Sequence, residues 1–155
     1  HFNKPLDYYN IVSPDSQMLR TEKQRLMQPQ KKEPDLRSRP SAFAQRDLSA
    51  FKSYEEAYHQ LIADIMLLQA QSTNTVLKGT PVKRIFVDGG FANNAVFMQL
   101  LALNFPQLVI YAAAVAQASA VGAALVIHKE WNPLPVPANL VKLKQYKSDH
   151  LNTNA

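Results

Sequence analysis

Residues 87–94 read Val-Asp-Gly-Gly-Phe-Ala-Asn-Asn, a pattern typical of a strand end, a double glycine and a helix start. At the carboxyl end of a parallel strand the crevice is open, and glycine lets the backbone approach a ligand because it lacks a Cβ. The first N–H groups of a helix suit an anion or the polar edge of a base. On local grounds a ligand site and a simple tight turn both stay open, since Gly-Gly pairs punctuate many loops.

Two common nucleotide motifs do not fit this stretch. A Rossmann turn needs a third glycine, and a P-loop ends in Gly-Lys followed by Ser or Thr. Asp88, directly before the glycines, is expected to fix the loop by a hydrogen bond to backbone donors rather than to act as a catalytic base, and a contact to the ribose of a nucleotide stays open.

The segment before the motif predicts a helix and then a strand. Ser53, with Glu56 three positions later, forms a capping box that starts a helix, and apolar residues at three- and four-residue steps continue it to about Leu77. Residues 82–87 are rich in β-branched and aromatic side chains and predict a short strand with Ile85 and Val87 on one side.

The segment after the motif repeats this alternation. Asn94 is expected to cap a helix that ends near Asn104, and residues 108–112 predict a second strand. An alanine-rich helix is expected over residues 115–129, with Gly122 packed closely against another segment. The prolines of residues 132–137 exclude a regular helix, so the tail is expected to wrap or dangle.

The order of elements predicts an α/β fold with parallel strands flanked by helices. Two strands make a marginal sheet, so further strands are expected outside this chain. We expect an irregular, partly helical segment at residues 1–50 with one helix over residues 15–27, a core at residues 51–131, and a tail at residues 132–155. Within the first segment, Asp-Tyr-Tyr at residues 7–9 and the neighbouring Ile and Val are expected to pack on another element.

Composition narrows the function classes. The chain has 155 residues and no cysteine, which excludes disulfides and thiolate metal sites and fits a cytoplasmic protein. Its net charge of +5 comes from Lys and Arg spread among Pro and Gln, which disfavours nucleic acid as a partner, and no apolar run could cross a membrane.

His59 and His128 are expected at the surface without a metal role. Because residue 1 is His and no leader pattern follows, we expect the chain to be part of a longer protein.

The motif at residues 87–94, followed about thirty residues later by Ala-Val-Gly-Ala-Ala at residues 120–124, resembles the FGGY carbohydrate kinases. The resemblance implies a partial actin-like, ribonuclease H-like lobe of an ATP-dependent sugar kinase. It implies that Gly89, Gly90, Phe91, Asn93 and Asn94 bind the adenosine of ATP, without saying which Asn contacts it.

The same resemblance implies Mg²⁺ as a cofactor and a small sugar as the substrate, a ketose or polyol such as xylulose, rhamnulose, fuculose or glycerol. The catalytic Asp and the phosphate motifs of the family have no counterpart here, so the chain is expected to need an amino-terminal lobe and to be inactive alone. Many members carry Glu where this chain has Gln117. A homodimer stays open, as do two other functions, an actin-like ATPase switch and a non-catalytic interaction module.

Overall fold

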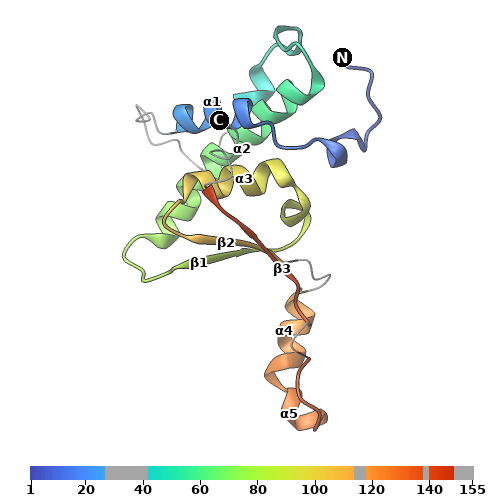
Figure 1. Cartoon of the computed structure of the whole chain (residues 1–155), viewed down its shortest axis with the longest axis vertical. Helices are drawn as coiled ribbons and strands as arrows, with labels where there is room; N and C mark the ends of the chain where they lie inside the picture. The colour runs from blue at the N-terminus through green and yellow to red at the C-terminus, as the bar shows by residue number, and fades with distance from the viewer. Residues whose placement is uncertain (27–41, 114–117, 138–139, 149–155) are drawn as a thin grey trace.

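The computed structural model describes residues 1–26, 42–113, 118–137 and 140–148 (Figure 1). Gln117 and the start of the helix expected over residues 115–129 lie outside these ranges. Within them the fold is a mixed α/β arrangement built on one three-stranded sheet.

The sheet has the strand order β1 (Arg84–Val87), β2 (Val109–Ala113), β3 (Leu143–Tyr146). β1 and β2 pair in parallel, as expected, with Arg84 opposite Val109. β3 pairs antiparallel to β2, so the expectation of only two strands was wrong, and of the two expected courses of the tail the structure shows the wrapped one. β3 is an exposed edge strand with Lys and Gln among its four residues. Such edges lack the apolar alternation by which a strand is recognised in a sequence.

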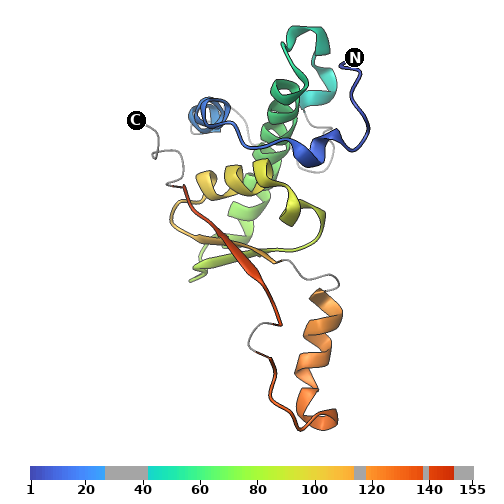
Figure 2. The same ribbon diagram turned by 45° about the vertical axis from the view of Figure 1, so that its right-hand side comes forward.

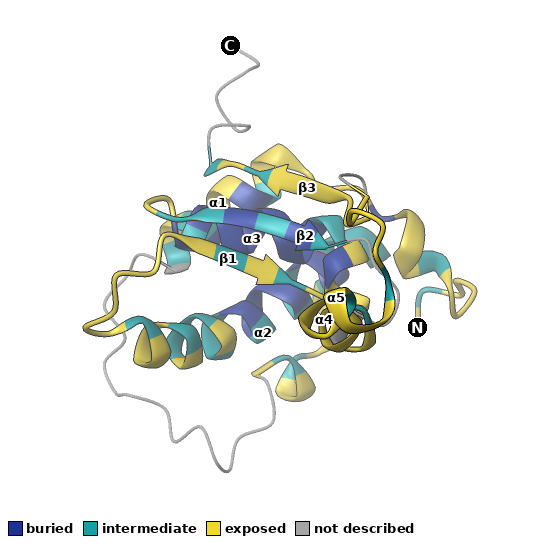
Figure 3. Cartoon of the chain, turned by 90° about the horizontal axis from the view of Figure 1, so that it is seen from below, coloured by how far each residue is buried: buried dark blue, intermediate teal, exposed yellow. Residues whose placement is uncertain are grey.

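Helices cover one face of this sheet in two layers (Figures 1 and 3). α3 (Ala95–Asn104) lies on the sheet, and α1 (Ser16–Leu26) and α2 (Tyr54–Leu77) pack against α3 from the other side. The eight consecutive residues 96–103 of α3 are all buried. A helix enclosed by a sheet and two further helices has no solvent face, which explains why all of its buried residues except Gln99 are apolar. The predicted extents of α2 and α3, with Ser53 and Asn94 as their caps, are confirmed.

The other face of the sheet has no helix among the described elements (Figure 3). Phe86 on β1 and Tyr111 on β2 stack there with ring centroids 5.2 Å apart, and Phe86 is 55% exposed. Ile85 and Val87 lie on one side of β1, as predicted, and that side packs against the core. The expectation of strands flanked by helices therefore holds on one face.

α4 (Ala118–Val126) and α5 (His128–Trp131) project away from the sheet as an arm (Figures 1 and 2). The helix is broken at Ile127, so the expectation of one uninterrupted helix was wrong. The close packing expected at Gly122 was also wrong, because a Cβ there would meet no atom within 4 Å. Small residues permit tight packing but do not require it when the helix lies away from its neighbours. No helix in the described ranges combines the length and apolar character needed to span a bilayer.

In the described parts of the first fifty residues, residues 1–26 and 42–50, lie α1 and three short 3-10 helices, η1 (Tyr8–Ile11), η2 (Ala42–Gln45) and η3 (Leu48–Ala50). This confirms the expected short helices, and α1 (Ser16–Leu26) lies within the helix expected over residues 15–27. Val12 and Leu19 are buried in the same core as α2 and α3. The amino-terminal segment is therefore packed into the body of the molecule, as the apolar residues beside Tyr8 predicted.

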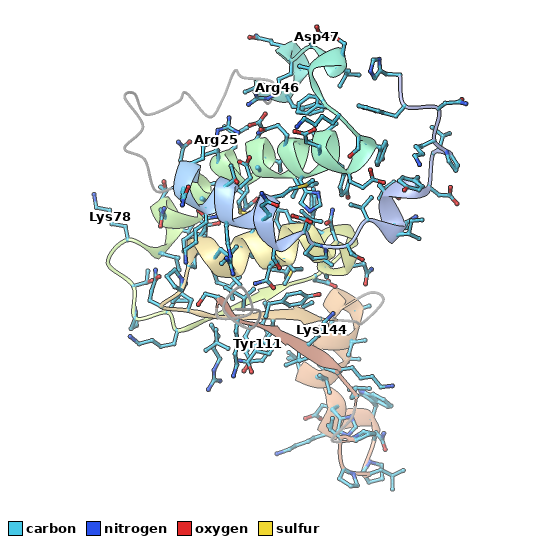
Figure 4. The ribbon with its side chains drawn as sticks, turned by 45° about the horizontal axis from the view of Figure 1, so that its top comes forward. Arg25, Arg46, Asp47, Lys78, Tyr111 and Lys144 are labelled. Atoms are coloured by element: carbon cyan, nitrogen blue, oxygen red, sulfur yellow. The ribbon has the colours of Figure 1, made fainter. Side chains whose placement is uncertain are left out.

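A buried polar cluster joins α1 and the segment directly after η2 to α2. The Asp64 carboxylate is fully buried and accepts hydrogen bonds from Arg46 at 2.7 and 3.0 Å, from Gln60 at 2.9 Å and from Arg25 at 3.4 Å. Figure 4 shows Arg25 and Arg46 approaching α2 from these two segments. Buried carboxylates are tolerated when their lone pairs are satisfied in this way.

His59 lies in the same region and is 3% exposed, so the expected surface position was wrong. Its Nδ1 donates to the Glu55 carbonyl at 2.7 Å and its Nε2 accepts from the Asp15 amide at 3.0 Å. Both nitrogens are satisfied by backbone groups, which lets this polar ring occupy an interior position on an amphipathic helix.

Glu22 gives the stability of the chain a pH dependence. Burial raises the pKa of Glu22, Arg25 lowers it and Asp64 raises it, with a net upward shift. A raised pKa means that the folded chain binds the proton more tightly than the unfolded chain does. The stability that this proton adds is fully present below the unfolded pKa of Glu22 and is lost as pH rises through its folded pKa. Because Glu22→Gln cannot titrate, we expect the free energy of unfolding of the parent chain, relative to that of the variant, to be larger at pH 4 than at pH 7. Urea denaturation at both pH values measures this, and equal differences would contradict it.

Candidate functional site

The double glycine sits at the carboxyl end of β1 and leads into a short 3-10 helix, η4 (Gly90–Asn93). Gly89 has φ 79° and ψ −159°, a conformation that residues with a Cβ rarely adopt, so glycine is required there by the backbone. Gly90 is not strained, and a Cβ at this position would meet no atom within 4 Å. Open space beside Gly90, rather than its conformation, is what makes this position suited to a ligand.

The side chain of Asn94 connects the start of α3 to α2. Its Oδ1 accepts from the Phe97 amide at 3.1 Å and so caps α3, while its Nδ2 donates to the Tyr58 hydroxyl on α2 at 2.8 Å. Burial raises the pKa of Tyr58, and the bond from Asn94 lowers it by less. The hydroxyl is therefore protonated at neutral pH, and its own hydrogen can still be donated to a ligand.

A pocket of about 350 Å³ opens next to this loop. It lies between η1, the first half of α2 and the start of α3, and its lining residues are Tyr9, Asn10, Val12, Tyr58, Ile62, Gly90, Phe91, Asn93, Asn94 and Ala95. Four of the five residues expected to bind a ligand are among them. Gly89 does not line the pocket, and its position indicates a part in shaping the turn.

Aromatic rings dominate two sides of the pocket. Phe91 is 45% exposed and its ring stacks on the buried ring of Phe97, with centroids 4.4 Å apart, so it is supported from behind. Tyr9 lies near Tyr58, with ring centroids 6.5 Å apart. A flat ligand can therefore stack on a fixed ring surface here. Tyr58 is packed in the core and also lines the pocket.

The two asparagines of the motif differ in what they can offer. Asn94 uses its amide oxygen and nitrogen within the protein. Asn93 is exposed, and its side chain makes no hydrogen bond to any residue that the structure describes. Of the two, Asn93 has its full set of donors and acceptors available to a ligand.

Sequence reasoning missed the half of the pocket that comes from η1 and α2. Tyr9, Asn10 and Val12 lie about eighty residues before the motif, and Ile62 is an ordinary core residue of α2 by its spacing. The only signal was the cluster of aromatic and apolar residues at residues 8–12. That cluster predicted packing but did not indicate against which element.

The pocket lining offers aromatic rings, side-chain amides and tyrosine hydroxyls. None of its lining residues carries a carboxylate, an imidazole or a cationic group.

Asp88 is exposed, and the described part of the chain gives its side chain no hydrogen bond, so the expected loop-fixing bond is not observed. No three His, Asp or Glu side chains within the described residues gather closely enough to hold a metal ion.

A scan of family models matches residues 8–134 to "Carbohydrate kinase FGGY, C-terminal domain". The match covers well over half of the chain, including the whole lining of the pocket. No curated protein and no solved structure matches. The chain therefore belongs to the FGGY carbohydrate kinases, a family of transferases. Within that family it represents the C-terminal domain, which implies a ribonuclease H-like, actin-like fold. Part of that fold is present here as a three-stranded mixed sheet that helices cover on one face.

Proposed function

We propose that this chain binds the adenosine of ATP in the pocket beside Gly90, as part of a kinase that transfers the γ-phosphate to a sugar hydroxyl. The observation that carries the proposal is that Gly90, Phe91, Asn93 and Asn94 lie together on one pocket of about 350 Å³. This volume falls within the range of about 300–1,000 Å³ typical of small-molecule sites.

Adenine fits the groups that the pocket presents. Its flat ring can stack on Phe91, which Phe97 supports from behind. The free amide of Asn93 offers a donor and an acceptor side by side, a pattern that an asparagine uses to bind the amino group and adjacent ring nitrogen of adenine. In this proposal Asn93 contacts the base, and Asn94 fixes the loop through α3 and Tyr58.

The reacting end of ATP must lie outside this pocket, because its lining holds no charged group. Phosphoryl transfer depends on positioning and on neutralising the phosphate charge. The described pocket residues do not fit Mg²⁺, which prefers carboxylate and phosphate oxygens and keeps several waters. In our proposal Mg²⁺ is held through the nucleotide, and an amino-terminal lobe supplies the general base and the residues that select the sugar, a ketose or polyol.

The test measures nucleotide binding by the 155-residue chain with isothermal calorimetry. We expect adenosine and ADP to bind, uridine to bind more weakly, and Asn93→Ala to weaken adenosine binding roughly threefold to tenfold, the value of one net hydrogen bond. Asn74→Ala is the matched control, because Asn74 is exposed on α2 and does not line the pocket. Failure of the chain to bind any adenine compound would overturn the proposal.

A second arm separates a kinase from an actin-like ATPase switch. The protein that contains this chain is supplied with ATP, Mg²⁺ and a panel of ketoses and polyols, and ADP release is followed. A kinase releases ADP only when its sugar is present. Equal release with and without every sugar would support the switch, and an absence of nucleotide binding would support a non-catalytic interaction module.

A further inference from the structure

A second, smaller hollow adjoins the candidate adenosine pocket at the carboxyl end of β2. Its volume is about 180 Å³, and its lining residues are Ala92, Asn93, Ala95, Ala112, Ala113, Lys144 and Tyr146. Asn93 and Ala95 line both hollows, so the two meet at the η4–α3 junction. The smaller volume falls below the usual range for a whole ligand and suits one group of a longer ligand.

Lys144 gives this hollow a positive charge. It lies on β3 opposite Ala112, and its Nζ is 4.9 Å from the centroid of the Tyr146 ring, within cation–π range. Figure 4 shows Lys144 on this strand. None of the lining residues is acidic, and in the described ranges Lys144 makes no salt bridge. The other walls are mostly alanines, whose short side chains leave space above the backbone.

We propose that the smaller hollow is an anion subsite in which Lys144 binds a phosphate of a ligand whose nucleoside occupies the larger pocket. The inference rests on the proposed function and extends it to a residue of the tail that the motif does not include. A ligand that passes over the exposed Asn93 reaches from one hollow to the other. The lysine ammonium binds phosphate as a point charge, and the short alanine walls admit the phosphate to it.

A lysine on an edge strand has another explanation, which is protection of that edge against pairing with a second chain. Edge protection requires a charged residue on the strand, but it does not require that residue to lie at a particular position. It predicts that Lys142 and Lys144 are equivalent in every binding assay, because both are exposed residues of the same segment. An anion subsite predicts that they differ, since Lys142 does not line the hollow.

The experiment compares Lys144→Met with the matched control Lys142→Met, in the 155-residue chain, by calorimetry with adenosine and ADP. We expect the parent chain to bind ADP roughly tenfold more tightly than adenosine, the value of one hydrogen bond to a charged group. In Lys144→Met this preference should disappear while adenosine affinity stays unchanged, and Lys142→Met should behave like the parent. The preference should also fall as salt is raised, because the contact is exposed to solvent.

A second measurement tests the subsite without the nucleoside. Tripolyphosphate is titrated into the chain, and the amide resonances of Ala112, Ala113 and Asn93 are followed by NMR. Resonance shifts that occur in the parent chain and are lost in Lys144→Met support the anion subsite. If adenosine does not bind while these shifts are seen, only the proposed function has failed. Equal shifts in the parent and in Lys144→Met, no shifts in either, or an equal loss of ADP affinity in the two Lys→Met variants would overturn the inference.

Discussion

A Gly90→Val variant is expected to bind adenosine and ADP roughly tenfold to hundredfold more weakly than the parent chain, without loss of stability. Gly90 lines the larger pocket, and a Cβ placed on it meets no protein atom within 4 Å, so the new side chain fills space that a ligand would occupy. Forcing a branched side chain into an occupied space costs about 1–3 kcal/mol, which corresponds to this loss of affinity. Calorimetry with adenosine measures it.

The control for this variant is Gly122→Val. Gly122 is also unhindered, since a Cβ there meets nothing within 4 Å, but it lies on the α4 arm, away from the pocket (Figure 2). Both variants should melt close to the temperature of the parent chain, because neither glycine has a positive φ. If Gly90→Val leaves adenosine affinity unchanged, the nucleoside is bound elsewhere.

The second large effect concerns stability. We expect Arg46→Met to lower the free energy of unfolding by about 3 kcal/mol, because it leaves the fully buried Asp64 carboxylate without its bidentate partner. The remaining partners, Gln60 and Arg25, satisfy only one oxygen of that carboxylate, Oδ1. Urea denaturation at pH 7 measures the loss, and in a chain of this size it corresponds to roughly 6–12 °C in melting temperature.

Two further variants give this prediction its controls. Arg25→Met removes a longer contact to the same carboxylate, at 3.4 Å, from a side chain that is 36% exposed, so its expected cost is below about 1 kcal/mol. Adding Asp64→Leu to Arg46→Met should recover most of the loss, because the unpaired charge is then gone. Equal losses in the two arginine variants would show that Asp64 does not depend on Arg46.

The parts of the fold that could be predicted are those whose sequence pattern is local. Ser53 and Asn94 cap the helices they were expected to cap, and the apolar spacing that follows each gave the extents of α2 and α3. The strand before the double glycine was predicted from its β-branched residues and confirmed. Caps and periodicity depend on neighbours within one or two turns, so they can be recognised without knowledge of the rest of the chain.

The parts that could not be predicted depend on distant contacts. β3 has an edge position and a mostly exposed sequence, so only its pairing with β2 makes it a strand. His59 is buried because the Asp15 amide, on a different segment, meets its ring. The motif at residues 87–94 predicted four of the residues that line the larger pocket. It could not predict Tyr9 and Tyr58, because they join the pocket only through tertiary contacts. Tertiary contacts override local preference at each of these positions.

The wall that η1 contributes to the larger pocket has a thermodynamic consequence. Since Tyr9, Tyr58 and Phe91 come from three distant parts of the chain, the lining of the larger pocket is complete only while the amino-terminal segment is packed on α2. By mass action, whatever occupies that surface holds the segment in place and raises the melting temperature with its concentration. Conversely, a substitution that loosens the segment lowers apparent affinity by the fraction of molecules left undocked, even when it touches no ligand atom.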